Sequence, residues 1–219
     1  ASDETEEANF VIETIQNFIS DDFGRNEIAI LYRSNAQSRI FEEKLIANGI
    51  PYRIYGGFRF FERAEIKDVI AYMRLAVSNN DNNSFERIIN NPPRGIGEKT
   101  KQTLREYSKD KGISLFNSIE NIIEESLLTK KACQSLKEFQ NIIKNIQSIL
   151  KEEELPHQIN EIINITGIKS VYEKNKTEQA RSKLENLDEL VSAASEFTNI
   201  DLDEGETIID AFLTHTSLE

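Results

Sequence analysis

The sequence predicts two folds in succession: a partial α/β segment over residues 1–80, and a mostly all-α helical domain over residues 81–219. Three observations support this division. An unbroken apolar run of strand length, Ile-Ala-Ile-Leu, occupies residues 28–31. A polar break of asparagine and aspartate follows at residues 79–83. Beyond that break, apolar residues recur only at helical intervals of three and four.

The α/β segment is predicted to contain a helix, a strand, a second helix and a second strand. The apolar run at residues 28–31 has the pattern of a strand buried on both faces, as in a parallel sheet. Ser34, with Gln37 three residues later, forms a capping box that begins the next helix, and Asn48-Gly49 ends that helix. Residues 52–55 supply the second strand, which completes a β-α-β unit. The first helix presents an apolar face made of Ala8, Val11, Ile12, Ile15 and Ile19.

A third helix begins near Glu62 and closes this segment. Its apolar face is made of Ile66, Val69, Ile70, Met73 and Val77.

The second domain is predicted to be all-α and to begin with a helix-hairpin-helix. A short helix carries Phe85 and Ile88, Pro92-Pro93 ends it, and Arg94-Gly95-Ile96-Gly97 turns the chain into a helix with Leu104. Five more apolar stripes predict the helices that follow. Their residues are Phe116, Ile119, Ile123; Leu136, Phe139, Ile143, Ile146; Ile159, Ile162, Ile163; Leu184, Leu187, Val191; and Ile208, Ile209, Phe212.

The length and composition of the chain limit the classes of protein to which it can belong. A chain of 219 residues can bury a sizeable core, and its single cysteine, Cys133, excludes an internal disulfide. No apolar run approaches the ~20 residues that span a bilayer. We therefore expect no membrane partner and a cytoplasmic location. His157 and His215 are isolated, so we expect no metal site.

The net charge of −12 does not exclude a nucleic-acid partner, because the acids are concentrated at the two ends. Residues 1–24 carry −7 and residues 183–219 carry −9, so residues 25–182 carry +4. Within that middle, residues 87–111 hold seven bases and three acids.

Tyr32 and Arg33 form the first candidate site. They follow the predicted strand and precede a helix N-terminus, a place where α/β proteins bind anions such as phosphate. The alternative is a surface ion pair for Arg33 and a sheet-edge aromatic for Tyr32.

The turn Arg94-Gly95-Ile96-Gly97, with Thr100 and Lys101, forms the second candidate site. Glycines let the backbone approach a phosphate closely, and the N–H groups that open the next helix can donate to it. Binding of this kind is independent of base sequence and sensitive to salt. The alternative is a plain helix–helix turn, and Thr166-Gly167-Ile168-Lys169, which faintly resembles it, is read as such a turn.

Arg59 and Arg63 lie among Gly56, Gly57 and Phe61 in a basic and aromatic patch suited to single-stranded DNA. The alternative for Phe58, Phe60 and Phe61 is the hydrophobic core, which we favour.

Several long motifs closely resemble the UvrD/PcrA/Rep group of superfamily 1 DNA helicases. They are YRSNAQSR at residues 32–39, YGGFRFFERAEIKD at 55–68, PRGIG at 93–97, QARSKLENLDE at 179–189 and FLTH at 212–215. The resemblance covers nearly the whole chain and implies a fragment of such an enzyme. Residues 1–80 would be the first part of RecA-like (P-loop NTPase-like) subdomain 2A, and residues 81–219 most of helical subdomain 2B.

The resemblance also implies roles for individual residues. Arg33 would reach the γ-phosphate of ATP, and Tyr32 would stack near the adenine. The turn at residues 94–97 would contact duplex DNA at a junction. The parent enzyme would use ATP and Mg²⁺ to move 3′ to 5′ on single-stranded DNA, in repair or replication, with subdomains 1A, 1B and the rest of 2A and possible repair proteins as partners.

The chain alone contains no G-x-x-x-x-G-K-[ST] motif, so we expect it to bind no ATP and to be inactive as an ATPase. Leu187-Asp188-Glu189 resembles an acidic magnesium motif of the Walker B type, but its helical spacing predicts a solvated helix face. A rival hypothesis is a non-catalytic DNA-binding or protein-docking and regulatory module. Arg33 discriminates between them, since it has a role only where an ATP-binding domain completes the cleft.

Overall fold

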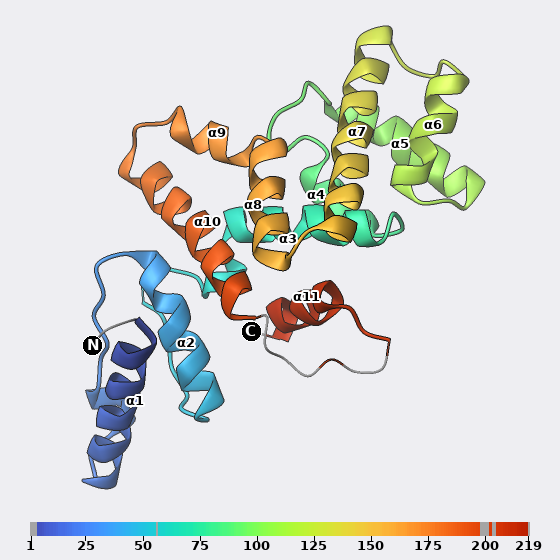
Figure 1. Ribbon diagram of the computed structural model, residues 1–219. Helices are drawn as coiled ribbons and strands as arrows, with labels where there is room; N and C mark the ends of the chain where they lie inside the picture. Colours follow the sequence, from blue (N-terminus) through green and yellow to red (C-terminus); the bar gives the residue numbers. More distant parts are fainter. Residues whose placement is uncertain (1–3, 56, 198–201, 203–204, 219) are drawn as a thin grey trace. The chain divides into compact units, whose positions relative to one another are not determined.

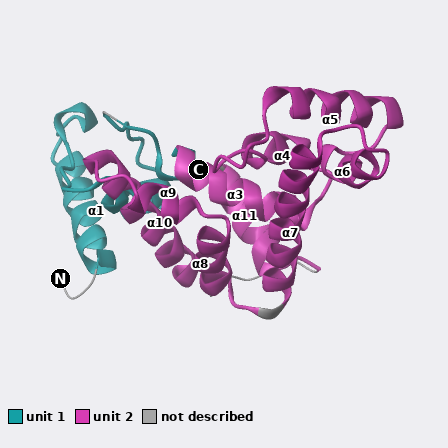
Figure 2. Ribbon diagram, turned by 90° about the horizontal axis from the view of Figure 1, so that it is seen from above, with its two compact units in different colours: residues 1–63 teal, residues 64–219 magenta. Residues whose placement is uncertain are grey.

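The computed structural model describes residues 4–55, 57–197, 202 and 205–218 (Figure 1). The chain divides into two compact units, residues 1–63 and residues 64–219 (Figure 2).

The first unit is built on two helices, α1 (Glu4–Ser20) and α2 (Ser38–Ala47), which pack against each other. Three short 3₁₀ turns connect or follow them: η1 (Arg25–Glu27), η2 (Asn35–Gln37) and η3 (Phe60–Glu62). Its small core consists of Ile12, Ile15 and Leu45, with Ile28, Ile30, Ile50 and Tyr52 partly buried against them. Gly49, at φ +62°, follows α2 as predicted.

The predicted strands at residues 28–31 and 52–55 are wrong, and with them the β-α-β unit and the α/β, RecA-like fold class. The described residues of this unit contain helices, turns and extended coil but no strand. Ile28 is extended (φ −108°, ψ 131°), and the side chains alternate: Ile28 and Ile30 pack on the helices while Leu31 is 93% exposed. A strand needs a second backbone to accept its hydrogen bonds, and this segment lies against helices instead. The apolar run therefore indicates burial of one face only.

The second unit is helical and has α3 (Ala64–Val77) at its centre. This helix packs against α4 (Asn82–Ile88), α7 (Lys130–Glu152), α8 (Leu155–Ile165) and α10 (Glu178–Glu196). The remaining helices are α5 (Glu98–Lys111), α6 (Leu115–Glu124), α9 (Ile168–Glu173) and α11 (Ile208–Leu218). Most of α3 is buried, which places it inside this unit, whereas the predicted domain boundary lies at residues 80/81.

The polar stretch at residues 79–83 is the capped start of α4. The carboxylate of Asp81 accepts a hydrogen bond from the Ser84 amide at 2.9 Å, as an N-cap does. Gly112, at φ +65°, ends α5, and the Ser114 hydroxyl accepts from the Asn117 amide to begin α6. No helix among the described residues is long and apolar enough to cross a membrane.

Candidate nucleic-acid interface and nucleotide site

The turn between α4 and α5, Arg94-Gly95-Ile96-Gly97, is called here the glycine turn. The Asn90 side-chain oxygen organises it, accepting from the amides of Arg94 at 2.8 Å and Ile96 at 3.2 Å. Gly95 has φ +75°, a conformation that other residues adopt only with strain. Ile96 is fully buried and anchors the turn to the core. The turn is therefore held in one shape from inside the protein.

Arg94 is directed into the protein. Its guanidinium donates to the carbonyl oxygens of Pro92 and Thr166, each at 2.8 Å, and Thr166 is the C-cap residue of α8. It also lies 5.6 Å from the ring centroid of Tyr72 and 5.9 Å from that of Phe139, within the range of a cation–π interaction. The guanidinium of Arg94 is thus bound by carbonyl oxygens and aromatic rings of the protein itself.

The exposed part of the glycine turn is formed by glycine backbone and lysine. Gly95, Gly97 and Lys99 are exposed and Lys101 is half-buried, whereas Thr100 is buried. Gly97 is the N-cap residue of α5, so the first amides of that helix have no acceptor within the helix. This end of α5 combines oriented N–H donors with two lysines.

One acid, Glu98, lies at the same helix start, where it pairs with Arg105. The guanidinium of Arg105 pairs with Glu98 and with Glu86, each at 2.5 Å. The hydrogen bond from Arg105 lowers the pKa of Glu98. Two carboxylates thus share one guanidinium, and Lys99 and Lys101 supply further positive charge at this helix start.

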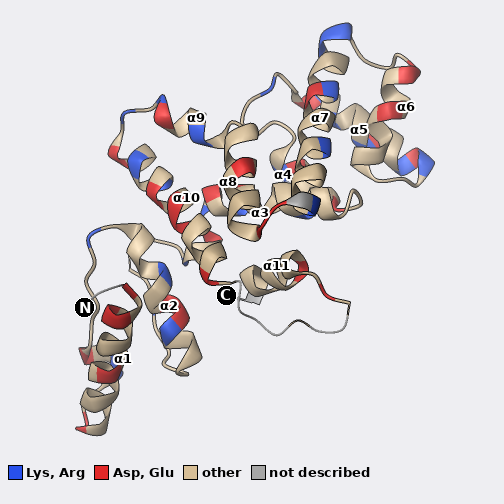
Figure 3. Ribbon diagram, viewed as in Figure 1, with Lys and Arg blue, Asp and Glu red and all other residues tan. Residues whose placement is uncertain are grey.

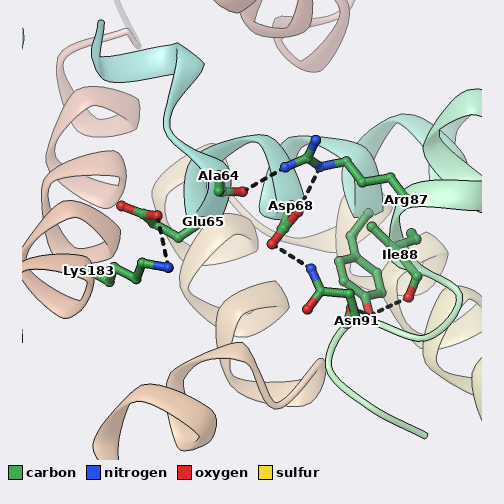
Figure 4. Close-up of polar contacts among 8 residues, drawn as sticks. Ala64, Glu65, Asp68, Arg87, Ile88, Asn91 and Lys183 are labelled. Atoms are coloured by element: carbon green, nitrogen blue, oxygen red, sulfur yellow. Dashed lines mark hydrogen bonds and ion pairs between the residues drawn. The ribbon is translucent and has the colours of Figure 1, made fainter. Parts of the chain in front are cut away.

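A buried polar network fixes the segment that leads into the turn (Figure 4). Asp68 of α3 accepts from Arg87 at 2.7 Å and from the Asn91 amide at 2.6 Å. The Tyr72 hydroxyl donates to the Asn91 carbonyl at 2.8 Å. Burial raises the pKa of Asp68, an effect that Arg87 and Asn91 oppose, and burial raises the pKa of Tyr72 to about 12.

The same network reaches α10. Glu65, one turn before Asp68 on α3, accepts from the Asn186 amide at 2.6 Å and lies 3.9 Å from the Lys183 ammonium. Sequence reasoning assigned no role to Glu65 or Asp68, although both lie in the quoted segment at residues 55–68. A sequence pattern could have indicated their burial, because the two acids stand three residues apart among the apolar residues of one helix.

Tyr32 and Arg33 lie just before η2 and α2. The side-chain oxygen of Gln37 accepts from the amides of Arg33 at 2.9 Å and Ser34 at 3.3 Å, so the glutamine half of the predicted capping box is present. The Ser34 hydroxyl makes no capping hydrogen bond, and the helix opens with a 3₁₀ turn. Tyr32 is half-buried. Arg33 is exposed, and its guanidinium has no ion pair among the described residues.

Arg59 and Arg63 separate in the structure. Arg63 is 7% exposed and donates to the Ser38 hydroxyl at 2.6 Å, and its guanidinium lies 5.2 Å from the Phe60 ring. Arg59 is exposed, with its guanidinium 5.4 Å from the Tyr52 ring. Of this pair, only Arg59 is accessible to a nucleic acid.

The aromatic residues of this patch divide in the same way. Phe60 and Phe61 are core residues, as favoured from the sequence, while Phe58 is 70% exposed. Gly56 lies outside the described residues.

Ser38, which accepts a hydrogen bond from Arg63, itself donates to the Glu42 carboxylate at 2.6 Å. Burial raises the pKa of Glu42, and hydrogen bonds from Ser38 and the Phe60 amide oppose this effect. This cluster is the polar core of the first unit.

Two observations concern the binding of metal ions. Across the residues that the structure describes, no group of three or more His, Cys, Asp or Glu side chains is placed to hold a metal ion. Leu187, Asp188 and Glu189 lie within α10, with Leu187 buried and Asp188 exposed, so this segment is an amphipathic helix as predicted.

Comparison with known proteins agrees with the resemblance seen in the motifs. The model of the UvrD-like helicase C-terminal domain matches residues 1–219. DNA helicase II of Escherichia coli (strain K12) is 40% identical and that of Haemophilus influenzae 43% identical, each over the whole chain and 30% of the relative. The ATP-dependent DNA helicase PcrA of Staphylococcus aureus (strain Mu50) is 36% identical, again over the whole chain and 30% of the relative. The chain thus spans about 30% of the length of these relatives, and it belongs to the UvrD-like helicase C-terminal domain family.

Proposed function

We propose that this chain acts as the DNA-engaging part of an ATP-dependent DNA helicase, with the glycine turn as its contact to duplex DNA near a junction. The observation that carries the proposal is the exposed, lysine-flanked start of α5, held rigidly by Asn90 and Arg94 within a chain of the helicase family. Gly95, Gly97 and Lys101 make the phosphate contact, with the accessible Lys99 beside them. Ile96, Thr100 and Arg94 support the turn from within.

In the parent enzyme, Arg33 contributes to ATP hydrolysis. Its exposed guanidinium would reach the γ-phosphate of ATP bound with Mg²⁺ by other domains, while Tyr32 lies near the adenine. An arginine in this role stabilises the charge on the transferring phosphoryl group and is worth ~10³- to 10⁵-fold in rate in well-studied cases. The partners are single-stranded DNA, subdomains 1A and 1B and the rest of subdomain 2A. Movement from 3′ to 5′ and a role in repair follow from the family resemblance alone, and the cytoplasmic location is the one expected from the composition.

The test measures DNA binding by the chain itself. Fluorescence anisotropy against a junction duplex across a salt series should give an affinity that falls as salt rises, because lysine–phosphate contacts release counterions. Lys101→Ala should weaken binding several-fold at low salt and reduce the salt slope by about 1.

A matched control is Lys109→Ala, an exposed lysine near the other end of α5, which should leave both quantities unchanged. An equal loss in both variants, or in neither, would remove the glycine turn from the interface. Gly95→Ala is a less clean probe, because its φ of +75° strains any side chain there.

A docking or regulatory role is a second candidate, favoured by a specific feature of the first unit. Four large apolar side chains are strongly exposed there: Phe10, Leu31, Tyr55 and Phe58. If Arg33→Ala in the full-length protein left ATP turnover unchanged, this role would displace the catalytic one.

A further inference from the structure

One face of α7 carries a regular row of lysines. Lys130, Lys137, Lys144 and Lys151 stand seven residues apart and are all exposed. An α-helix completes two turns in ~7.2 residues, so the four lie along one face over ~31 Å. Figure 3 shows the resulting bands of positive charge recurring along the helix. We name these four residues the lysine stripe.

Two lysines of the stripe, Lys137 and Lys144, lack the acidic neighbours that usually accompany lysines on a helix surface, whereas Lys151 has Glu154 three residues later. Such partners stand three or four residues away. Around Lys137 and Lys144 those positions are occupied by Cys133, Gln134, Gln140, Asn141, Gln147 and Ser148, none of them acidic. No ammonium of the stripe has an ion pair within the described parts of the chain, whereas Arg39 pairs with Glu43 and Arg105 with Glu98.

The stripe lies on the side of α7 that faces away from the core. The buried face of the helix is formed by Leu136, Phe139, Ile143 and Ile146. Ser135 faces the glycine turn, since a Cβ placed on Gly95 would lie 3.8 Å from its hydroxyl oxygen. At ~100° per residue, the stripe is about half a turn around the helix from Ser135. It is therefore a surface separate from the glycine turn.

We propose that the lysine stripe is a second, sequence-independent binding surface for the phosphate backbone of nucleic acid. The four ammonium groups have no ion pair among the described residues and create a local positive field in a chain of net charge −12, a field that favours an anionic partner. Asn141 lies between Lys137 and Lys144 on the same face and supplies an amide, a group that commonly contacts phosphate and sugar. Gln134 and Ser148 lie on this face too, where Gln134 donates to the Glu138 carboxylate and Ser148 to the Lys144 carbonyl.

Nucleic acid fits this surface better than a protein does. Protein interfaces gather aromatic and other apolar residues at a fully buried centre. Among the described side chains, no large apolar residue of α7 is strongly exposed. A duplex presents one charge per ~1.7 Å of its axis, so each lysine of the stripe would find a phosphate within reach.

The test removes three charges while keeping the helix. Lys137, Lys144 and Lys151 are changed together to glutamine, which is a good helix former, and circular dichroism verifies that α7 is retained. The matched control changes Lys109, Lys174 and Lys176 to glutamine, three exposed lysines outside α7 with the same change in net charge. Anisotropy of a labelled duplex of about 24 base pairs, from low to moderate salt, gives affinity and salt slope.

The proposal predicts that the α7 variant loses at least ~10-fold in affinity at low salt and that its salt slope falls by about 2 to 3, with little change in the control. Adding Lys101→Ala separates the two surfaces, because independent contacts give effects that multiply.

Four results would overturn the proposal: an unchanged slope in the α7 variant, an equal loss in the control, no further loss when Lys101→Ala is combined with it, or no DNA binding by the unmodified chain at low salt. A further measurement uses an oligoglutamate peptide as the anion. If the α7 variant no longer bound this peptide but bound DNA with unchanged affinity, nucleic acid would not be the partner of the stripe.

Discussion

Arg33 and Arg94 each stand a few residues before a helix, yet one is exposed and the other is turned into the protein. Around Arg33, the contact that shapes the backbone is local, from Gln37 to the Arg33 and Ser34 amides. Arg94 instead reaches the carbonyl of Thr166, 72 residues away, and lies near two aromatic rings.

The difference shows what decides the role of an arginine at a turn. A guanidinium has five donors, and backbone carbonyls at a helix C-terminus accept them well. Where another helix end lies within reach, as that of α8 does for Arg94, the side chain becomes part of the framework. Where only a short local turn surrounds it, as at Arg33, the side chain stays available to a ligand.

Arg94→Ala should have the largest effect on folding. It leaves the carbonyls of Pro92 and Thr166 without their donors and removes the cation–π contacts, so the free energy of unfolding should fall by about 2 to 3 kcal/mol. For a chain of this size, the melting temperature should fall by about 5–10 °C. Thermal unfolding followed by circular dichroism measures this.

Arg94→Lys sharpens that comparison, because lysine retains the charge without the planar fork that reaches two carbonyls. It should remain destabilised. If Arg94→Lys folded and bound DNA like the unmodified protein, the charge alone would matter and the comparison with Arg33 would break.

Asn90→Ala should have a smaller and more local effect. The turn amides of Arg94 and Ile96 lose their common acceptor, which costs about 1–2 kcal/mol. Hydrogen exchange resolved by NMR should show both amides exchanging faster, while amides in the middle of α7 keep their protection. Asn90→Asp retains an acceptor oxygen and is the matched control. Unaltered exchange at Ile96 in Asn90→Ala would mean that the turn is held by Arg94 alone.

Arg33→Ala should have the smallest effect on stability. An exposed side chain without an ion pair contributes within about 0.5 kcal/mol, so the melting temperature of this chain should hardly move. In the full-length protein the same change should reduce ATP turnover strongly while DNA affinity stays nearly constant. A clear loss of stability in Arg33→Ala would show that the guanidinium has a structural partner after all.

Helices were predictable because their signals are local. Apolar spacing located α3 and α10, and Asn48-Gly49 located the end of α2, since a helix satisfies most of its hydrogen bonds within one segment. The strands at residues 28–31 and 52–55 were mispredicted because strand formation depends on a partner backbone, which a periodic pattern does not reveal.

The same distinction between local signals and contacts of distant residues applies to the candidate sites. Motifs identified the glycine turn and the Tyr32–Arg33 segment as positions of interest, and the exposed Gly95 and Gly97 agree with a close backbone approach. No local pattern revealed that Arg94 and Arg63 point inward, or that Asp68 fixes Asn91. Each of those contacts joins residues at least 23 positions apart. A long charged side chain can point into the protein or into solvent, and its sequence neighbours do not show which.

By itself, the sequence determined the family, the helical periodicity of the second unit, and the glycine and lysine residues at the start of α5. Only the tertiary structure decided which of the basic side chains bind carbonyls and acids within the protein and which have no such partner among the described residues. The physical reason is that a cation is held by whichever acceptor comes within hydrogen-bonding distance, and at Arg94 that acceptor is supplied by a distant helix end.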